Sequence, residues 1–303
     1  MIYSIIGTGG IGGYYGGRLA QHGHEVHFLL HSDYDHVREH GLQVDSANGS
    51  FHLSNPLIHY DAATMPLSDV VLVCLKTINN HLLPQLLAKV ADEHTIVILI
   101  QNGIGVEEDV QAALPHLQLV AGLAFICTAK VAPGHISHQC YGQINLASYS
   151  CAEESRLQQI ADVFSAADIP AHIVEYREAR WKKAVWNMPF NGMTVALQTQ
   201  TDILLRNAAT RQLIREQMME IVAAARQQGI QGVDEDFVET MINMTDVMTP
   251  YSPSMKLDYD NHRPMEIHYI YSRPLQIARE AGMPMPKLEM LEAELRFLEE
   301  RNR

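Results

Sequence analysis

The chain opens with a short apolar run that leads directly into a glycine-rich turn. Residues 2–6 read IYSII, and residues 7–12 read GTGGIG, a G-x-G-x-x-G pattern. A stretch rich in small residues follows, and a second apolar run occupies 25–30. A strand, a glycine turn, a helix and a second strand in this order form the context in which G-x-G-x-x-G binds a dinucleotide. The N-terminus therefore predicts a nucleotide-binding unit.

Each glycine of this pattern has its own physical task. Gly7 permits the tight turn, Gly9 lets the backbone approach a pyrophosphate, and Gly12 lets the helix pack closely on the strand. The N-terminus of the helix then offers unpaired N–H groups and a positive dipole end to the phosphates. The residues of this turn that we expect to bind the cofactor are Gly7, Thr8, Gly9, Gly10, Ile11 and Gly12.

Further strand-like runs predict that this unit extends into a larger sheet. The runs are 69–76, 95–103, 119–125 and 134–148, with helical stretches at 81–91, 106–113 and 152–167. Strands that alternate with helices indicate an α/β fold with a Rossmann-type, doubly wound parallel sheet. Such sheets bind ligands at the carboxyl ends of their strands, which makes Lys76 and Asn102 candidate site residues. The alternative is a solvated loop lysine and a turn-forming asparagine.

The choice between NAD and NADP depends on the residues that follow the second strand. NAD-binding proteins usually place an acid there for the ribose 2′-hydroxyl, whereas NADP-binding proteins place cations or hydroxyls. This chain has His31 and Ser32, which suit a phosphate, and then Asp33, which argues for NAD. The balance favours NADP(H), with His31 and Ser32 as contacts.

The second half of the chain has the apolar periodicity of α-helices. Apolar residues recur at intervals of three and four in the stretches 210–229, 234–248, 264–282 and 286–302. We therefore expect an NADP-binding domain over 1–174 and an all-α helical domain for substrate binding and dimerisation over 175–303. Most methionines should lie in the helical core or on a partner surface.

The stretch RWKKAVWNMPFNG, at 180–192, holds two adjacent lysines that point in different directions on a helix. Residues four apart share a helical face. The face of Lys183 continues to Asn187 and Asn191, an ammonium followed by two amides. The face of Lys182 continues to two aromatic residues, Trp186 and Phe190, which are expected to pack. The pattern favours Lys183 as the functional lysine over the alternative of a solvated side chain.

Composition excludes several classes of function. A formal net charge of −13 argues against a nucleic-acid binder, which would have a basic surface. No apolar run reaches the roughly 18–20 residues of a membrane span. The four cysteines form no C-x-x-C pair, which is typical of a reduced, cytoplasmic protein. The sixteen histidines show no convincing metal-binding spacing, so we expect no metal.

Short motifs along nearly the whole chain resemble those of the ketopantoate reductases, the 2-dehydropantoate 2-reductases of pantothenate biosynthesis. They are GTGGIGG, LVCLKT, IQNGIG, W-x-K-x-x-x-N at 181–187, SPSM at 252–255, RPMEI at 263–267 and AGMPMPKLEML at 281–291. The resemblance implies an NADP-dependent oxidoreductase acting on CH–OH groups. Its reaction would be the NADPH-dependent reduction of a small-molecule 2-oxo acid, most directly ketopantoate to pantoate.

The resemblance also implies roles for individual residues. Lys183 would donate the proton to the ketone oxygen, and Glu266 would act beside both ligands as a catalytic and cofactor-binding residue. Lys76 would approach the cofactor. Positioning of substrate or nicotinamide would fall to Asn102, Asn187, Asn191 and Ser254, of which Asn102 also contacts the cofactor.

The match is weaker on the substrate side. His31 stands where many family members have Arg, and His268 stands where they have Asp. The alternatives are therefore a related 2- or 3-hydroxyacid dehydrogenase with another substrate, and a non-catalytic NADPH-sensing protein. A homodimer through the helical domain is a further expectation.

Overall fold

The computed structural model describes residues 1–302, which form two compact units. The first unit comprises residues 1–101 and 106–176, and the second comprises residues 102–105 together with the chain from 177 onward. The sequence predicts one division, after residue 174. In the structure the division falls after Tyr176, and the segment 102–105 is grouped with the second unit.

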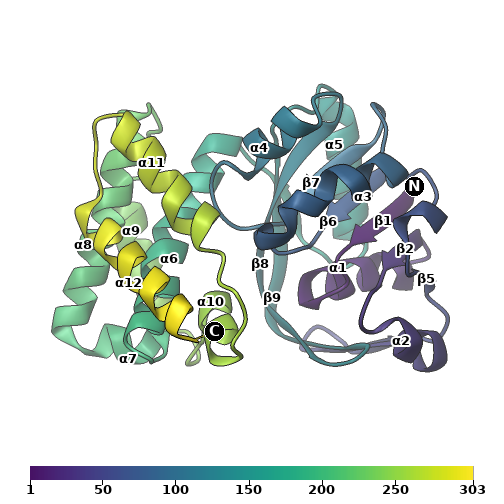
Figure 1. Ribbon diagram of the computed structural model, residues 1–303, viewed down its shortest axis with the longest axis horizontal. Helices are drawn as coiled ribbons and strands as arrows, with labels where there is room; N and C mark the ends of the chain where they lie inside the picture. Colours follow the sequence, from purple (N-terminus) through teal and green to yellow (C-terminus); the bar gives the residue numbers. More distant parts are fainter. Residues whose placement is uncertain (303) are drawn as a thin grey trace. The chain divides into compact units, whose positions relative to one another are not determined.

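The first unit is built on one ten-stranded sheet with the order β4-β3-β9-β8-β7-β6-β1-β2-β5, in which β10 also pairs with β9 (Figure 1). Its strands are β1 (Ile2–Ile6), β2 (Glu25–Leu29), β3 (Leu42–Ser46), β4 (Phe51–Leu53), β5 (Leu57–His59), β6 (Val70–Val73), β7 (Ile96–Leu99), β8 (Gln118–Ala132), β9 (His135–Ser148) and β10 (Ala171–Ile173). Neighbours from β5 to β8 along this order run parallel. By contrast, β8 and β9 form a long antiparallel hairpin.

Helices cover this sheet. They are α1 (Gly10–Gln21), α2 (Tyr34–His40), α3 (Leu83–Val90), α4 (Val106–Ala113) and α5 (Glu154–Ala166), with short 3-10 turns η1 (Ala62–Thr64) and η2 (Thr77–Leu82). Tyr3 and Ile5 of β1 are buried together with Tyr15 of α1 and Phe164 of α5 in one apolar core. Because side chains alternate along a strand, Ile6 lies on the other face of the sheet.

The Rossmann-type parallel sheet predicted from the sequence is confirmed, with differences at its margins. The bounds of β1 and α4 are as predicted. The strand predicted at 95–103 is too long, since β7 ends at Leu99 and the chain then leaves the sheet. β9 nearly coincides with the strand-like run predicted at 134–148, whereas β8 continues to Ala132, well beyond the predicted 119–125. The antiparallel pairing of these two strands as a long hairpin was not predicted. The strands β3, β4 and β5 are short and partly polar. They therefore lack the apolar run by which strands such as β1 and β6 were predicted, and they were not predicted.

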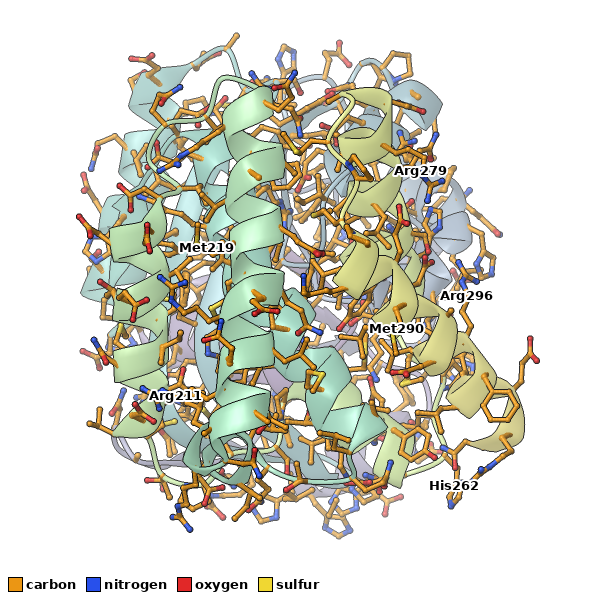
Figure 2. All side chains as sticks on the ribbon, turned by 90° about the vertical axis from the view of Figure 1, so that its left-hand side faces the viewer. Arg211, Met219, His262, Arg279, Met290 and Arg296 are labelled. Carbon is orange, nitrogen blue, oxygen red and sulfur yellow. The ribbon has the colours of Figure 1, made fainter. Side chains whose placement is uncertain are left out.

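The second unit is helical, as predicted. Its elements are α6 (Tyr176–Ala196), α7 (Thr201–Arg206), α8 (Ala208–Gln227), α9 (Glu235–Asp246), α10 (Ser254–Asp260), the π-helical turn η3 (His268–Ser272), α11 (Arg273–Glu280) and α12 (Pro286–Asn302). Figure 2 shows α8 beside α12 on one face of this unit. Met218 is fully buried in the core, whereas Met290 is 65% exposed on that face. No helix among residues 1–302 is long and apolar enough to cross a membrane.

A backbone hydrogen bond joins the segment 102–105 to this helical unit. Pro274, near the start of α11, has no N–H to donate to the carbonyl of Tyr269, five residues earlier in the π-helical turn. That carbonyl accepts a hydrogen bond from the Ile104 N–H at 2.9 Å. Gly103 makes the approach possible, because its φ is +108° and a Cβ there would lie 2.4 Å from the Tyr269 oxygen.

We expect Gly103→Ala to destabilise the protein more than Gly229→Ala. Both glycines have left-handed backbone angles, with φ of +81° at Gly229, but a Cβ at Gly229 would meet no atom within 4 Å. The control therefore carries only backbone strain of about 1 kcal/mol, whereas Gly103→Ala adds an overlap worth about 1–3 kcal/mol. Chemical denaturation measures both values. Equal losses would show that the close contact with Tyr269 contributes nothing.

Candidate functional site

The predicted cofactor residues of the first unit lie at one edge of its sheet. The strands β6, β1 and β2 are neighbours and parallel, so the segments that follow them emerge at the same edge. These segments carry Lys76 after β6, the glycine turn after β1, and His31 with Ser32 after β2. Lys76 is half-buried and precedes η2, three residues beyond the end of β6 at Val73. The topology therefore gathers the predicted residues of this unit at the edge where doubly wound sheets bind ligands.

The glycine turn has the shape that a dinucleotide requires. Gly7 has φ of +100°, and a Cβ there would lie 2.8 Å from the Leu75 nitrogen. A Cβ at Gly12 would lie 2.3 Å from the Gly7 carbonyl oxygen, so this glycine is required for the close packing of α1 on β1. Nothing lies within 4 Å of a Cβ built on Gly9, which leaves open space above its backbone. The turn thus fits a bound pyrophosphate.

The residues after β2 are arranged in two groups. His31 is exposed and stacks on the ring of Tyr60, with centroids 5.3 Å apart. The Ser32 hydroxyl donates to Asp33 at 2.9 Å, and the buried Asp33 carboxylate forms an ion pair with Lys130 at 2.8 Å. Burial would raise the pKa of Asp33, but hydrogen bonds from Lys130, Gly134 and Ser32 hold it below its ordinary value.

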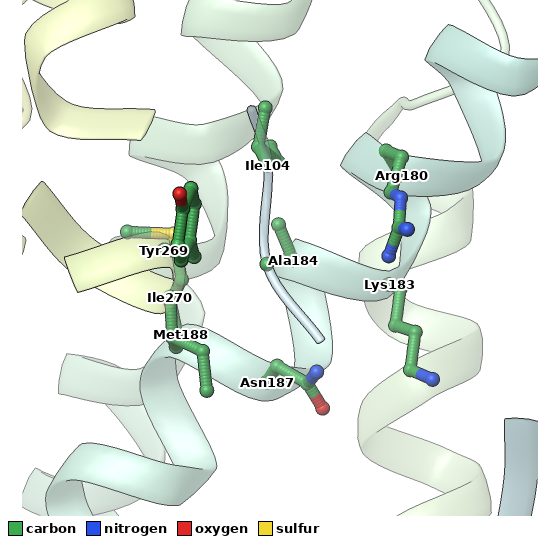
Figure 3. Close-up of a pocket in the computed structure, with 9 residues that line it drawn as sticks. Ile104, Arg180, Lys183, Ala184, Asn187, Met188, Tyr269 and Ile270 are labelled. Atoms are coloured by element: carbon green, nitrogen blue, oxygen red, sulfur yellow. The ribbon is translucent and has the colours of Figure 1, made fainter. Parts of the chain in front are cut away.

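A small pocket opens on α6 in the second unit (Figure 3). Its cavity volume is about 10 Å³, enough for roughly one water molecule or one oxygen atom of a ligand. The residues that line it are Gly103, Ile104, Arg180, Lys183, Ala184, Asn187, Met188, Tyr269 and Ile270. Lys183 and Asn187, which the sequence places on one helical face, thus lie at the same pocket.

Burial and charge set the protonation of Lys183. Part of its side chain is reached from the pocket, but protein surrounds most of it. This burial, together with the nearby Arg180 cation, lowers the pKa of Lys183 to about 7, against the opposing influence of the Glu266 carboxylate. Arg180 is only 2% exposed and Glu266 only 9% exposed, so solvent screens these charges weakly. An ammonium with such a pKa is able to give up its proton near neutral pH.

The other predicted residues of the second unit lie at different places. Asn191 is 1% exposed and its Oδ1 accepts a long hydrogen bond of 3.5 Å from the Met255 N–H, so it supports the start of α10. Ser254 is exposed as the first residue of α10. Asn102 is half-buried and immediately precedes the pocket residue Gly103. None of these three lines the pocket as the structure describes it.

The neighbouring lysine has different surroundings. Lys182 forms an ion pair with Glu178 at 2.6 Å, and its ammonium lies 5.4 Å from the centre of the Phe237 ring. The next residues of its face, Trp186 and Phe190, contact each other with ring centroids 5.0 Å apart. The aromatic face predicted for Lys182 therefore packs against the helical core.

Two basic residues were missed by sequence reasoning. Arg180 lines the Lys183 pocket and lies three residues before Lys183, a spacing that puts both on one side of a helix and could have revealed it. Lys130 meets Asp33 only because the β8–β9 hairpin brings it there, and no local signal in the sequence indicates that contact. Among residues 1–302 no group of three or more His, Cys, Asp and Glu is arranged to hold a metal ion.

Comparisons with known proteins agree with these observations. The family model "Ketopantoate reductase PanE/ApbA" matches residues 3–150, and its C-terminal counterpart matches residues 175–299. A 2-dehydropantoate 2-reductase from Nostoc sp. is 43% identical over 99% of this chain and 96% of its own.

Solved structures extend the comparison to the fold. A 2-dehydropantoate 2-reductase from Geobacter metallireducens superposes with a TM-score of 0.94 at 34% identity, with complete coverage of both chains. A D-mandelate dehydrogenase solved with NADH and anilino(oxo)acetate has a TM-score of 0.92 over 100% of this chain and 99% of its own. At 22% identity, this second likeness concerns the fold alone.

The charges around the pocket lead to a direct prediction about Lys183. NMR of protein with ¹³C-labelled lysine, assigned with Lys183→Met, should show Lys183 titrating near pH 7. Arg180→Met should raise this midpoint because it removes a nearby cation, and Glu266→Gln should lower it because it removes a nearby anion. A midpoint at the ordinary value of 10.5, unaffected by either change, would contradict the burial argument.

Proposed function

Since the chain belongs to the ketopantoate reductase family and is therefore an oxidoreductase acting on CH–OH groups, we propose that it reduces ketopantoate to pantoate with NADPH. The substrate proposal is supported by the Nostoc relative of this name, which matches nearly the full length of both chains. The observation that carries the mechanism is Lys183, a largely buried lysine that lines a pocket beside Asn187.

The first unit would hold the cofactor. Gly7 to Gly12 would cradle its pyrophosphate, and His31 and Ser32 would meet its 2′-phosphate. Lys76 would also approach the cofactor. Asn102 and Glu266 remain predicted contacts for its nicotinamide half. When bound, NADPH supplies the hydride. The open space over Gly9 and the arrangement of β6, β1 and β2 support this assignment.

Lys183 would act as the general acid. Reduction of a ketone places negative charge on the carbonyl oxygen, which the Lys183 ammonium stabilises before it transfers a proton to that oxygen. The amine that remains regains its proton from water. A pocket with room for about one oxygen atom suits a carbonyl oxygen beside this ammonium. Asn187, on the next turn of α6, would orient the substrate through its amide.

The remaining proposed contacts concern the carboxylate and hydroxyl groups of the substrate. A 2-oxo acid is an anion, and the Arg180 cation beside the pocket favours an anion there. The amides of Asn102 and Asn191 and the hydroxyl of Ser254 are able to bind polar groups without adding charge. Glu266 would contribute by keeping part of the Lys183 population protonated, since its carboxylate favours the ammonium.

The proposal is tested by the initial rate of NADPH oxidation with ketopantoate, measured beside NADH and a panel of other 2-oxo acids. We expect fast turnover with ketopantoate and NADPH. Turnover of a different oxo acid alone would change the substrate and keep the reaction class. Binding of NADPH without reduction of any oxo acid would contradict the enzymatic proposal.

Substitution of the two adjacent lysines separates their roles. Lys183→Met should lower kcat by about 10²–10⁴-fold, the usual contribution of a general acid, while the Kd for NADPH changes little. Lys182→Met is the matched control, since it removes a partly exposed ion pair with Glu178 and a contact with the Phe237 ring, both away from the pocket, and should change kcat less than about twofold. A larger loss for Lys182→Met than for Lys183→Met would overturn the assignment.

The pH dependence of the reduction provides a further test. The acid must be protonated, so kcat/KM should be constant at acidic pH and fall as pH rises through about 7. In the reverse direction, the oxidation of pantoate, the same group must accept a proton. The kcat/KM for pantoate should therefore rise as pH increases through about 7. A profile that stays flat in both directions through neutral pH would exclude Lys183 as the titrating acid.

A further inference from the structure

An acidic residue stands where dinucleotide-binding proteins select NAD, yet it is held in a separate ion pair. Asp33 follows the glycine turn by about twenty residues, the usual distance of the acid that binds the ribose 2′-hydroxyl. We propose that Lys130 sets the cofactor preference for NADPH by holding the Asp33 carboxylate away from the ribose. This inference rests on the proposed function, because it presumes that the first unit binds a nicotinamide cofactor.

Both oxygens of Asp33 are occupied by donors of the protein. The Oδ1 atom accepts from the Lys130 ammonium at 2.8 Å and from the Ser32 hydroxyl at 2.9 Å. The Oδ2 atom accepts from the Gly134 N–H at 3.1 Å. We call Asp33 with these three donors the Asp33 latch. The Asp33 residue is only 5% exposed, so little of it is left for a ribose hydroxyl.

The position of Asp33 at the start of α2 would suit an ordinary helix cap, but its side chain makes no capping hydrogen bond. An aspartate at this position commonly accepts from the N–H groups of the first helical turn. Here the side chain turns to the β8–β9 hairpin instead. The latch is therefore a specific tertiary contact rather than a local consequence of helix formation.

The hairpin is shaped to deliver these donors. Lys130 lies near the end of β8, and Gly134 lies in the turn between β8 and β9 with φ of +62°. A Cβ at Gly134 would lie 2.8 Å from the His36 ring and 3.0 Å from a Val37 methyl, so the turn packs directly on α2. The close fit of turn and helix keeps the Lys130 ammonium and the Gly134 N–H at the carboxylate.

The latch changes the charge that a cofactor would meet. An unpaired carboxylate beside the ribose would attract the 2′-hydroxyl of NADH and repel the 2′-phosphate of NADPH. Lys130 neutralises that carboxylate, and its own side chain is 35% exposed, so its positive charge also reaches solvent. His31, which is exposed, then remains as a side chain available to a phosphate, and Ser32, whose hydroxyl donates to Asp33, would contribute its backbone N–H.

The test is the Kd of NADPH and of NADH, measured by nucleotide fluorescence for the wild type and four variants. The variants are Lys130→Met, Lys130→Arg, Asp33→Asn and the double variant Lys130→Met with Asp33→Asn. We expect Lys130→Met to lower the ratio of NADPH affinity to NADH affinity by about tenfold, through repulsion of the 2′-phosphate. Lys130→Arg should keep the ratio, because it retains the charge.

The double variant distinguishes charge from folding. Removal of the carboxylate should restore most of the preference lost in Lys130→Met, and Asp33→Asn alone should leave NADPH binding intact. If Lys130→Met weakens both nucleotides equally, and the double variant restores nothing, Lys130 is merely structural and the inference fails. A wild type that binds NADH as tightly as NADPH also overturns it. A wild type that binds neither nucleotide instead overturns the proposed function.

Discussion

The hydrogen bond from the Ile104 N–H to the Tyr269 carbonyl organises the second unit around its pocket. It ties Ile104 to the π-helical turn of the second unit, and Gly103 and Ile104 form part of the lining of the Lys183 pocket. The bond needs a carbonyl oxygen that can accept from outside its own helix and a backbone with no side chain at the contact. Pro274 and Gly103 meet these two requirements, although they lie far apart in the sequence. π-Helical turns often occur at functional sites, and this one supplies both the carbonyl and two pocket residues.

Charges of opposite sign lie close together at one place in each unit. Beside Lys183, a buried cation and a buried carboxylate act in opposite directions on one proton. After β2, a lysine cancels an aspartate and leaves a neutral pair. The charges that act on Lys183 and on Asp33 belong to residues that are either little exposed or tightly paired. Solvent therefore screens them weakly. Both places are therefore locally neutral or cationic, although the chain as a whole has a net charge of −13.

The sequence predicted those elements whose structure depends on residues close together in the chain. The strand and glycine turn at 2–12, the helix at 106–113 and the helix at 286–302 follow from periodicity and turn chemistry. Spacing on α6 also predicted that Lys183 and Lys182 lie on different faces of the helix, as their different surroundings show. Contacts made across the chain could not be predicted in this way. The β8–β9 hairpin, the meeting of Lys130 with Asp33, and the grouping of 102–105 with the second unit all depend on tertiary packing between residues distant in sequence.

The division of the chain into units has a consequence for how such proteins can be recombined. The chain passes from one unit to the other at 101/102, 105/106 and 176/177, so the boundary is not a single point. A chimera joined only near residue 176 would take its pocket helix from one parent and Gly103 and Ile104 from the other. The two parents would then have to agree on the glycine at 103 and on the turn around Tyr269. Exchange of the second unit between relatives that differ at these positions therefore requires residues 102–105, NGIG in this chain, to be transferred with it.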